Sequence, residues 1–249
     1  MLGSSNGISC ANIMLNTTVA ESLRQYADKL EAAEDFNTAL HELIRSVIRE
    51  HKRIIFNGNG YDDAWIEEAT EKRGLLNLPT TPDCLPYLIK QKNIELFERH
   101  RIYSATEAKA RYEILLDNYC KILNIEARTM LEMAKRQILP AVSAYTADVA
   151  RAVTEKKAAM PQIDCTYEQE RISELSELTA KMHSSVKELE EAMQRVKSIV
   201  DVAQLSCAYR DEVILCMNSL RTAADKAETI TAEKYWPYPS YGDLLFGVR

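Results

Sequence analysis

A glycine-rich stretch, RIIFNGNGYDDAWIEEATEKRGL at residues 53–75, has the spacing of a loop that could hold a phosphate at the start of a helix. A nucleotide-binding loop of this kind needs a lysine and a serine or threonine after its last glycine. Neither follows Gly60, and Asp62 and Asp63 would repel a phosphate at a helix start. No strand–helix–strand pattern surrounds the loop either. We therefore interpret Gly58 and Gly60 as parts of a structural turn, with positive φ at one or both.

The remaining reactive residue types form no recognisable site. Six cysteines lie scattered without a C-x-x-C pair, which indicates reduced thiols rather than a disulfide framework. No histidine lies three or four residues from another histidine or a cysteine, so we expect no protein-built metal site. Ser4 and Ser5 have no histidine and aspartate placed nearby to activate them. We expect no catalytic residue and no metal ligand in this chain.

Composition narrows the classes of partner. The 249 residues are 46% hydrophobic and 27% charged, with a formal net charge of -6. An acidic chain is a poor match for nucleic-acid phosphates, so we expect no nucleic-acid partner. No apolar run approaches the roughly 20 residues of a membrane span, and the first residues lack the pattern of a signal peptide. We expect a cytoplasmic protein with no membrane partner.

Sparse turn residues predict long helices. No glycine occurs between Gly74 and Gly242, and Pro140 and Pro161 are the only prolines in residues 87–236. Such a stretch excludes a sheet of short strands and predicts an all-α fold. Apolar periodicity predicts helices over residues 12–33, 36–51 and 105–159. A bend is expected at Pro140, since proline removes a helical hydrogen bond.

Side chains that cap helices set several expected boundaries. Asp62 or Asp63 is expected to cap the helix that ends at Gly74, which has basic residues in its last turn. Thr81 precedes a proline at a helix start. The spacings Ser104-x-x-Glu107 and Thr166-x-x-Gln169 each predict a capping box at the start of a long helix.

The clearest periodicity lies between residues 172 and 203, where steps of three and four carry an almost unbroken apolar series. A partner series with the same rhythm runs from Val213 to Ala227. The two series predict a coiled-coil-like antiparallel hairpin that turns near residues 201–209 and joins the preceding helix in a long-helix bundle. Pairing between two chains is the alternative. The aromatic and proline-rich segment 236–249 is expected to dock back on this fold.

Three stretches resemble the C-terminal part of type III glutamine synthetases. They are residues 1–31, residues 51–86, and residues 208–228 together with the closing WPYPSYGDLLF at 236–246. The residues that mark this resemblance, and that we expect to be structural, are Asn57, Gly58, Asn59, Gly60, Tyr61, Trp65, Arg210, Asp211 and Trp236.

The residue patterns together with the resemblance predict four parts: the helical end of the synthetase core at residues 1–52, a connecting segment at 53–104, the bundle at 105–235 and the tail at 236–249. The resemblance implies a parent enzyme that joins ammonia to glutamate through γ-glutamyl phosphate, with ATP and Mg or Mn. The family's catalytic, ATP-binding and metal-binding residues would precede Met1, and Gly3, Ser4 and Ser5 would lie nearest to that active site.

On this interpretation the chain itself carries no cofactor and is inactive alone. It would be a structural and assembly module that packs on the upstream catalytic domain of the same protein, within a homo-oligomer. A free-standing helical protein–protein interaction module is the alternative from a different functional class.

Overall fold

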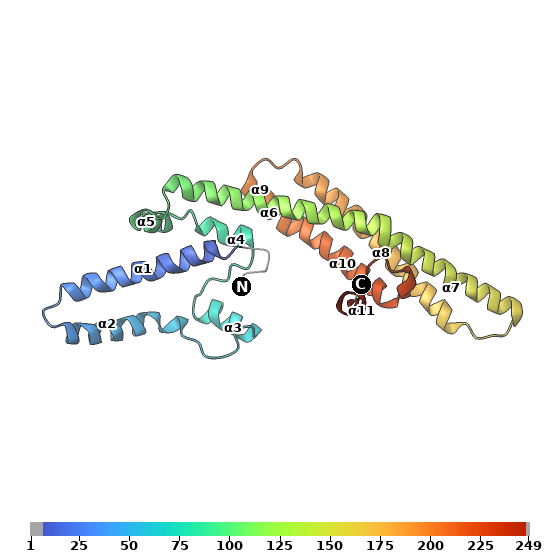
Figure 1. Cartoon of the computed structure of the whole chain (residues 1–249), viewed down its shortest axis with the longest axis horizontal. Helices are drawn as coiled ribbons and strands as arrows, with labels where there is room; N and C mark the ends of the chain where they lie inside the picture. The colour runs from blue at the N-terminus through green and yellow to red at the C-terminus, as the bar shows by residue number, and fades with distance from the viewer. Residues whose placement is uncertain (1–6, 248–249) are drawn as a thin grey trace. The chain divides into compact units, whose positions relative to one another are not determined.

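The structure, a computed structural model, describes residues 7–247. It divides into two compact units, Met1–Tyr112 and Glu113–Arg249, with the division falling inside helix α6 (Ala105–Met133). The regular elements of residues 7–247 are all helical and include no strand, which confirms the all-α class (Figure 1). Each unit has its own buried core.

The first unit is built around a small core beside α5 (Gln91–Arg99). Ile94, Phe97, Tyr103 and Ala108 are buried, and apolar residues near the start of α1 pack against them. The predicted helix 36–51 matches α2, and the predicted helix 12–33 corresponds to α1. The other helical elements are as follows: α1 (Ser9–Glu31), α2 (Phe36–His51), the 3₁₀ helix η1 (Lys52–Ile54), α3 (Asp63–Glu67), the π-helix η2 (Glu68–Lys72), α4 (Thr81–Cys84) and the 3₁₀ helix η3 (Leu85–Tyr87).

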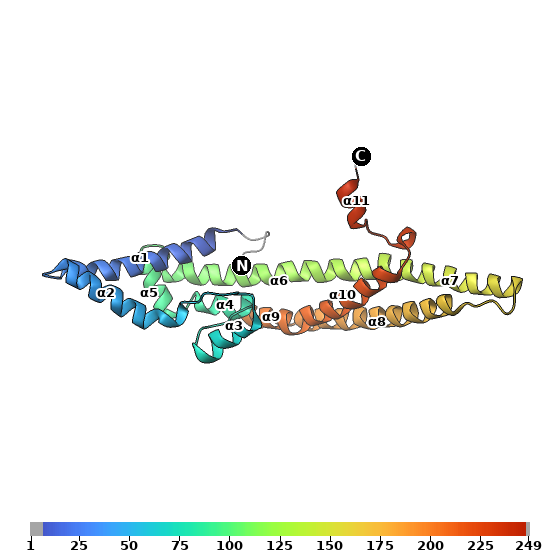
Figure 2. The same cartoon turned by 90° about the horizontal axis from the view of Figure 1, so that it is seen from below.

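The second unit is a bundle of long helices. Helix α8 packs against both α7 and α10, and Figures 1 and 2 show it running alongside each of them. The predicted apolar series of α8 supplies much of the core, including Leu175, Met182, Leu189 and Val196, each at most 2% exposed. The elements after α6 are the π-helix η4 (Ala134–Ile138), α7 (Leu139–Ala159), α8 (Thr166–Val196), α9 (Val202–Ala208), the π-helix η5 (Tyr209–Val213), α10 (Ile214–Ile230), the 3₁₀ helix η6 (Glu233–Tyr235) and α11 (Tyr241–Phe246).

Pro140 lies at the start of α7, directly after a π-helical turn. A proline inside an α-helix has no N–H to donate and its ring collides with the preceding turn. The wider turn of η4, in which the N–H of Leu139 donates to the carbonyl of Ala134, takes up this misfit. The segment 105–159 is therefore helical throughout, as predicted, with a π-helical turn where a bend was expected.

The capping predictions had mixed outcomes. Ser104 and Glu107 form the predicted capping box: the N–H of Ser104 donates to Glu107 at 2.8 Å, and that of Glu107 donates to the Ser104 hydroxyl oxygen at 3.3 Å. The box predicted from Thr166 was wrong. Asp164 accepts from both the N–H and the hydroxyl of Thr166, which places Thr166 inside the first turn of α8 instead of before it.

Candidate functional site

The glycine turn lies between η1 and α3 and has its own hydrogen bonds. The side chain of Asn59 accepts from the N–H of Tyr61 at 3.1 Å, and that of Asp62 accepts from the N–H of Ala64 at 3.0 Å. Asp62 is therefore the helix cap that the sequence predicts. These side chains already occupy N–H groups that a bound phosphate would use, and the two aspartates repel an anion. The geometry is that of a structural turn.

The reason for glycine in this turn differs from the expected one. Neither Gly58 nor Gly60 has a positive φ, so that prediction was wrong. At Gly58 a Cβ atom would come within 2.7 Å of the Phe56 ring, which indicates that close packing of the ring favours glycine there. Among residues 7–247, positive φ occurs at Gly74 (62°) and Arg101 (55°). Gly74 thus provides the left-handed residue that ends η2.

An arginine closes the same segment onto the helix that follows it. The Phe56 and Trp65 rings stack with centroids 3.7 Å apart, and the Arg73 guanidinium lies 4.8 Å from the Trp65 ring centroid. Arg73 also donates to the carbonyls of Arg53 and Ile55, at 3.1 and 2.8 Å, and pairs with Glu68 at 2.6 Å. We call this set the Arg73 clamp. It holds residues 53–56 in a 3₁₀ turn and an extended exit, where the sequence suggested a short strand-like run.

A second ionic group surrounds Glu21 on α1. Glu21 is buried, and its Oε1 accepts from Arg24, Gln25 and Arg99 at 2.7–3.0 Å. Its other oxygen lies 2.7 Å from His100 Nε2. The Arg24 hydrogen bonds are the main reason that the Glu21 pKa lies far below its ordinary value. This Glu21 cluster ties α1 to the end of α5. Sequence analysis missed it because its members are up to 79 residues apart.

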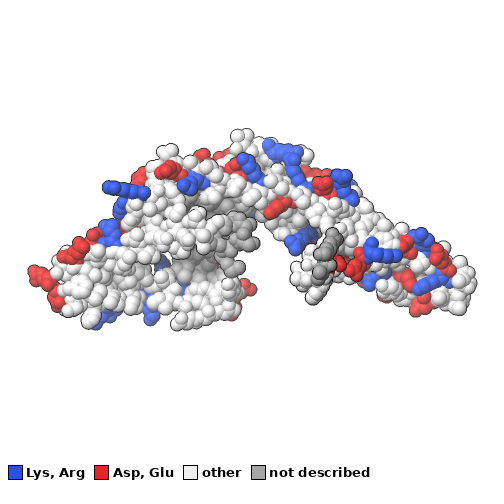
Figure 3. Space-filling view, in the orientation of Figure 1, with Lys and Arg blue, Asp and Glu red and all other residues white. Residues whose placement is uncertain are grey.

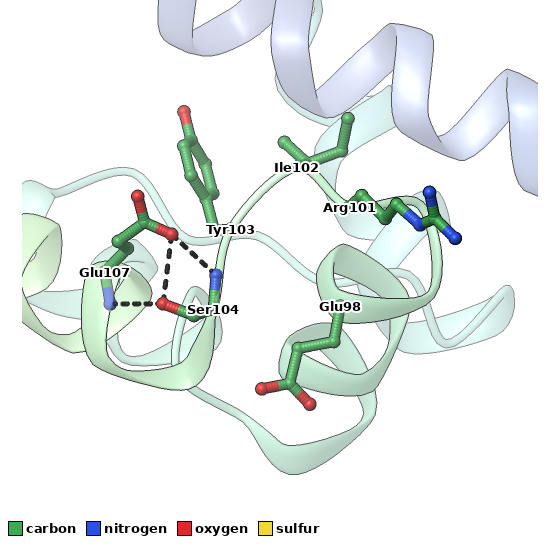
Figure 4. A pocket seen from close by; sticks show the side chains of 6 residues that line it. All are labelled: Glu98, Arg101, Ile102, Tyr103, Ser104 and Glu107. Carbon is green, nitrogen blue, oxygen red and sulfur yellow. Dashed lines mark hydrogen bonds between the residues drawn. The ribbon is translucent and has the colours of Figure 1, made fainter.

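A surface hollow of about 250 Å³ lies at the junction of α5 and α6 (Figure 4). Its two carboxylates both accept hydrogen bonds at the start of α6: Glu107 accepts from the N–H of Ser104, and Glu98 accepts from the N–H of Ala105 at 3.0 Å. In Figure 4 the Arg101 side chain points away from both carboxylates. Since the carboxylates serve as helix caps, the hollow is a helix junction without a ligand-binding arrangement.

Two aromatic residues of the tail pack on the second unit. Trp236 and Tyr238 are partly buried against its core, and Tyr238 bonds to Gln137. The hydroxyl of the preceding Tyr235 donates to Asp148 on α7. These contacts hold residues 235–238 to α7 and η4.

The sequence-predicted residues do not converge on one site. Arg210 and Asp211 pair with each other in η5, and this pairing lowers the Asp211 pKa. Gly3, Ser4 and Ser5 lie outside the described residues. Within residues 7–247 no three His, Cys, Asp or Glu side chains are grouped to hold a metal ion. No helix in this same range is long and apolar enough to cross a membrane.

The fold and these contacts define an all-helical protein whose ionic and aromatic groups join one helix to the next. A sequence model of the "Glutamine synthetase C-terminal domain" matches residues 39–157. The chain is 37% identical over 218 residues to a glutamine synthetase of Butyrivibrio fibrisolvens, covering 88% of this chain and 31% of that protein. It is 32% identical over 255 residues to the type-3 glutamine synthetase of Dictyostelium discoideum, covering 98% and 34%. The chain belongs to the glutamine synthetase C-terminal domain family, of type III.

A third relative, a glutamine synthetase of Bacteroides fragilis, is 25% identical over 254 residues, which cover 98% of this chain and 34% of that protein. The chain thus spans about a third of the length of the curated relatives it matches.

Proposed function

We propose that this chain is the structural and assembly module of a type III glutamine synthetase. The parent enzyme would join ammonia to glutamate with ATP, through γ-glutamyl phosphate, in the cytoplasm and as a homo-oligomer. The observation that carries the proposal is that charged side chains of this chain bind other segments of the same fold. Glu21, Arg73 and Asp148 are each engaged in contacts that join separate segments of the fold.

A catalytic group needs an open position beside it for the reacting atom. The Glu21 carboxylate instead accepts hydrogen bonds from three side chains and lies against a fourth, and Arg73 donates to two backbone carbonyls as well as to Glu68. Groups that are saturated in this way hold helices in place, which supports a structural role.

The described residues do not fit the metal and nucleotide of the parent reaction. The family's chemistry needs several converging carboxylate or imidazole ligands, and residues 7–247 bring no three such groups together. In the glycine turn, Asn59 and Asp62 likewise accept from the N–H groups of Tyr61 and Ala64. We therefore assign ATP, Mg or Mn, the substrates and the catalytic steps to the catalytic domain of the parent protein.

The proposal is tested with the purified chain and with a full-length relative shortened by its matching third. Given glutamate, ammonia, ATP and Mg²⁺, the chain alone is expected to form no glutamine. The shortened synthetase is expected to lose the assembled mass of the full-length enzyme in sedimentation velocity. Turnover by the chain alone would refute the proposal. Normal mass of the shortened enzyme would favour a free-standing interaction module.

A further inference from the structure

The two cysteines of the first unit differ from the other four in their exposure to solvent. Cys10 on α1 and Cys84 on α4 are both exposed. The four cysteines of the second unit are buried or half-buried: Cys120, Cys165, Cys207 and Cys216. A thiol must be accessible to react with a reagent in solution. The accessible thiols of this chain are therefore both in its first unit.

Both exposed cysteines lie one helical turn from the same small core. Met14, four residues after Cys10, packs against the core beside α5. Leu88, four residues after Cys84 in a helical segment, packs against the same core. Residues four apart on a helix lie on the same side of it. The chain after Leu88 then reaches the Glu21 cluster, further along α1, so the two segments run in the same direction. One turn back from the shared core, the two thiols lie in the same region of the first unit.

The electrostatics of Cys84 agree with this placement. The residue is exposed as a whole, but its thiol lies against α4 and donates to the carbonyl of Thr81 at 3.5 Å. Burial of the thiol is the main cause that raises the Cys84 pKa, and the negative charges of Asp83 and Cys10 raise it further. A like charge disfavours ionisation when it is close. The packing and the charge effect both indicate that the two sulfur atoms are near each other.

The sequence around both thiols is poor in charge. Residues 1–20 contain no charged side chain, and Asp83 is the only charged residue in the segment 74–89. Figure 3 shows the surface over α1 and α2 as largely uncharged. The neighbouring residues therefore provide no cation that would hold either cysteine as a reactive thiolate. Thiols of this kind remain reduced in a reducing solution and form a disulfide when an oxidised partner becomes abundant.

We propose that Cys10 and Cys84 form a reversible disulfide with each other when a small-molecule disulfide of the glutathione type becomes abundant, and that this bond fixes the start of α1 to α4. One cysteine thiolate attacks glutathione disulfide, which forms a mixed disulfide and releases one glutathione. The second cysteine thiolate attacks the first cysteine's sulfur, which forms the bond between them and releases the second glutathione. The two cysteines lose two electrons and two protons, and glutathione disulfide gains them.

The bond would act where α1 is least constrained by its own sequence. Helix α1 begins after Ile8, which provides no side-chain cap, whereas α2 and α3 begin with an aspartate cap. A covalent link between residues 10 and 84 closes a long loop and reduces the freedom of the unfolded chain. This property goes beyond the proposed structural role, because it makes the stability of the first unit depend on the thiol–disulfide balance of the surroundings.

The test incubates the chain with reduced glutathione or with glutathione disulfide, blocks the remaining thiols with N-ethylmaleimide and digests the protein with trypsin. Cleavage at Arg24, Arg73 and Lys90 places the two cysteines in the peptides 1–24 and 74–90, which contain one cysteine each. With glutathione disulfide, mass spectrometry is expected to find these two peptides linked, and reduction is expected to separate them.

Serine variants identify the sulfur atoms that form the bond. Cys10→Ser and Cys84→Ser are each expected to abolish the linked peptide, and both are expected to fold because their positions are exposed. The control Cys207→Ser, in the second unit, is expected to leave the linked peptide unchanged. The peptide masses of the unchanged chain test the bond even if a variant fails to fold.

The linked chain is also expected to resist unfolding. With Trp65 fluorescence as the signal, glutathione disulfide is expected to raise the urea midpoint of the first unit by about 1 M or more. The same treatment of Cys84→Ser is expected to shift the midpoint by less than about 0.2 M, because no loop is closed.

Four outcomes overturn the inference. Cys10 and Cys84 carry glutathione without becoming linked; or one of them is linked to a cysteine of the second unit; or the link joins two chains, which a nonreducing gel shows as a dimer; or a fully linked chain unfolds at an unchanged midpoint. None of these measurements involves the shortened synthetase, so their failure leaves the proposed function untouched.

Discussion

The replacement Leu189→Ala tests whether α8 forms the centre of the second unit. Leu189 is 0% exposed and belongs to the core that α8 shares with its neighbours. Removing a fully buried leucine side chain costs its transfer free energy and leaves a cavity that the surrounding helices fill only partly. The expected loss is about 2 to 5 kcal/mol of unfolding free energy. The control Leu215→Ala, at a position 63% exposed, is expected to cost less than about 0.5 kcal/mol.

The two tryptophans allow the units to be followed separately. Trp236 packs against the core of the second unit, and Trp65 belongs to the Arg73 clamp of the first. With Trp65→Phe as a common background, urea unfolding followed by Trp236 fluorescence reports on the second unit. A loss of about 3 kcal/mol with a slope of about 2 kcal/mol per molar urea lowers the midpoint by about 1.5 M.

The reasoning is refuted if Leu189→Ala and Leu215→Ala shift the midpoint equally, or if Leu189→Ala shifts it by less than about 0.3 M. Either result would mean that α8 does not lie against its neighbours through this side chain. An unchanged slope is required for the comparison, because a changed slope signals a different unfolded or native state.

Three further predictions concern the first unit, each followed by Trp65 fluorescence. The Glu21 pKa is lowered in the folded state, so the stability that its carboxylate contributes is present above the ordinary pKa of 4.5 and is lost as the pH falls below that value. The Glu21→Gln variant is therefore expected to show a flatter dependence of stability on pH below about pH 4.5. An unchanged slope would contradict the hydrogen-bonded carboxylate. Gly74→Ala is expected to lower the free energy of unfolding by about 1 kcal/mol, because Gly74 has a φ of 62°. Arg101→Gly, at a residue with a φ of 55°, is expected to leave the free energy of unfolding unchanged or to raise it. Urea midpoints that move in the opposite directions would contradict the backbone argument. Asp62→Ala is expected to cost about 1 kcal/mol through loss of the α3 cap, with Asp63→Ala as the control.

The helices were predictable where a local pattern decides the structure. The apolar rhythm over residues 172–203 identified α8 because consecutive residues on one side of a helix recur every three or four positions. The same reasoning predicted α1 and α2. A row of apolar residues on one side of a helix does not, however, predict which surface packs against it. Val19 and Leu23 belong to the stripe that identified α1, and both are exposed in the chain.

The candidate sites were less predictable, because they join distant segments. The Glu21–His100 contact spans 79 residues, and the Arg73 contact to Arg53 spans 20. No spacing rule connects such pairs. The cap at Thr166 failed for a local reason: Asp164, two residues earlier, provides a carboxylate that competes with the expected hydroxyl.

Reconstitution tests the central claim most directly. A full-length relative is shortened by its matching third, this chain is added, and the rate of glutamine formation is measured together with the assembled mass. The account predicts that neither part alone forms glutamine at the full-length rate, and that mixing them raises both the rate and the mass. A shortened enzyme that is fully active and assembled without the chain, or a chain that forms glutamine by itself, would contradict the account.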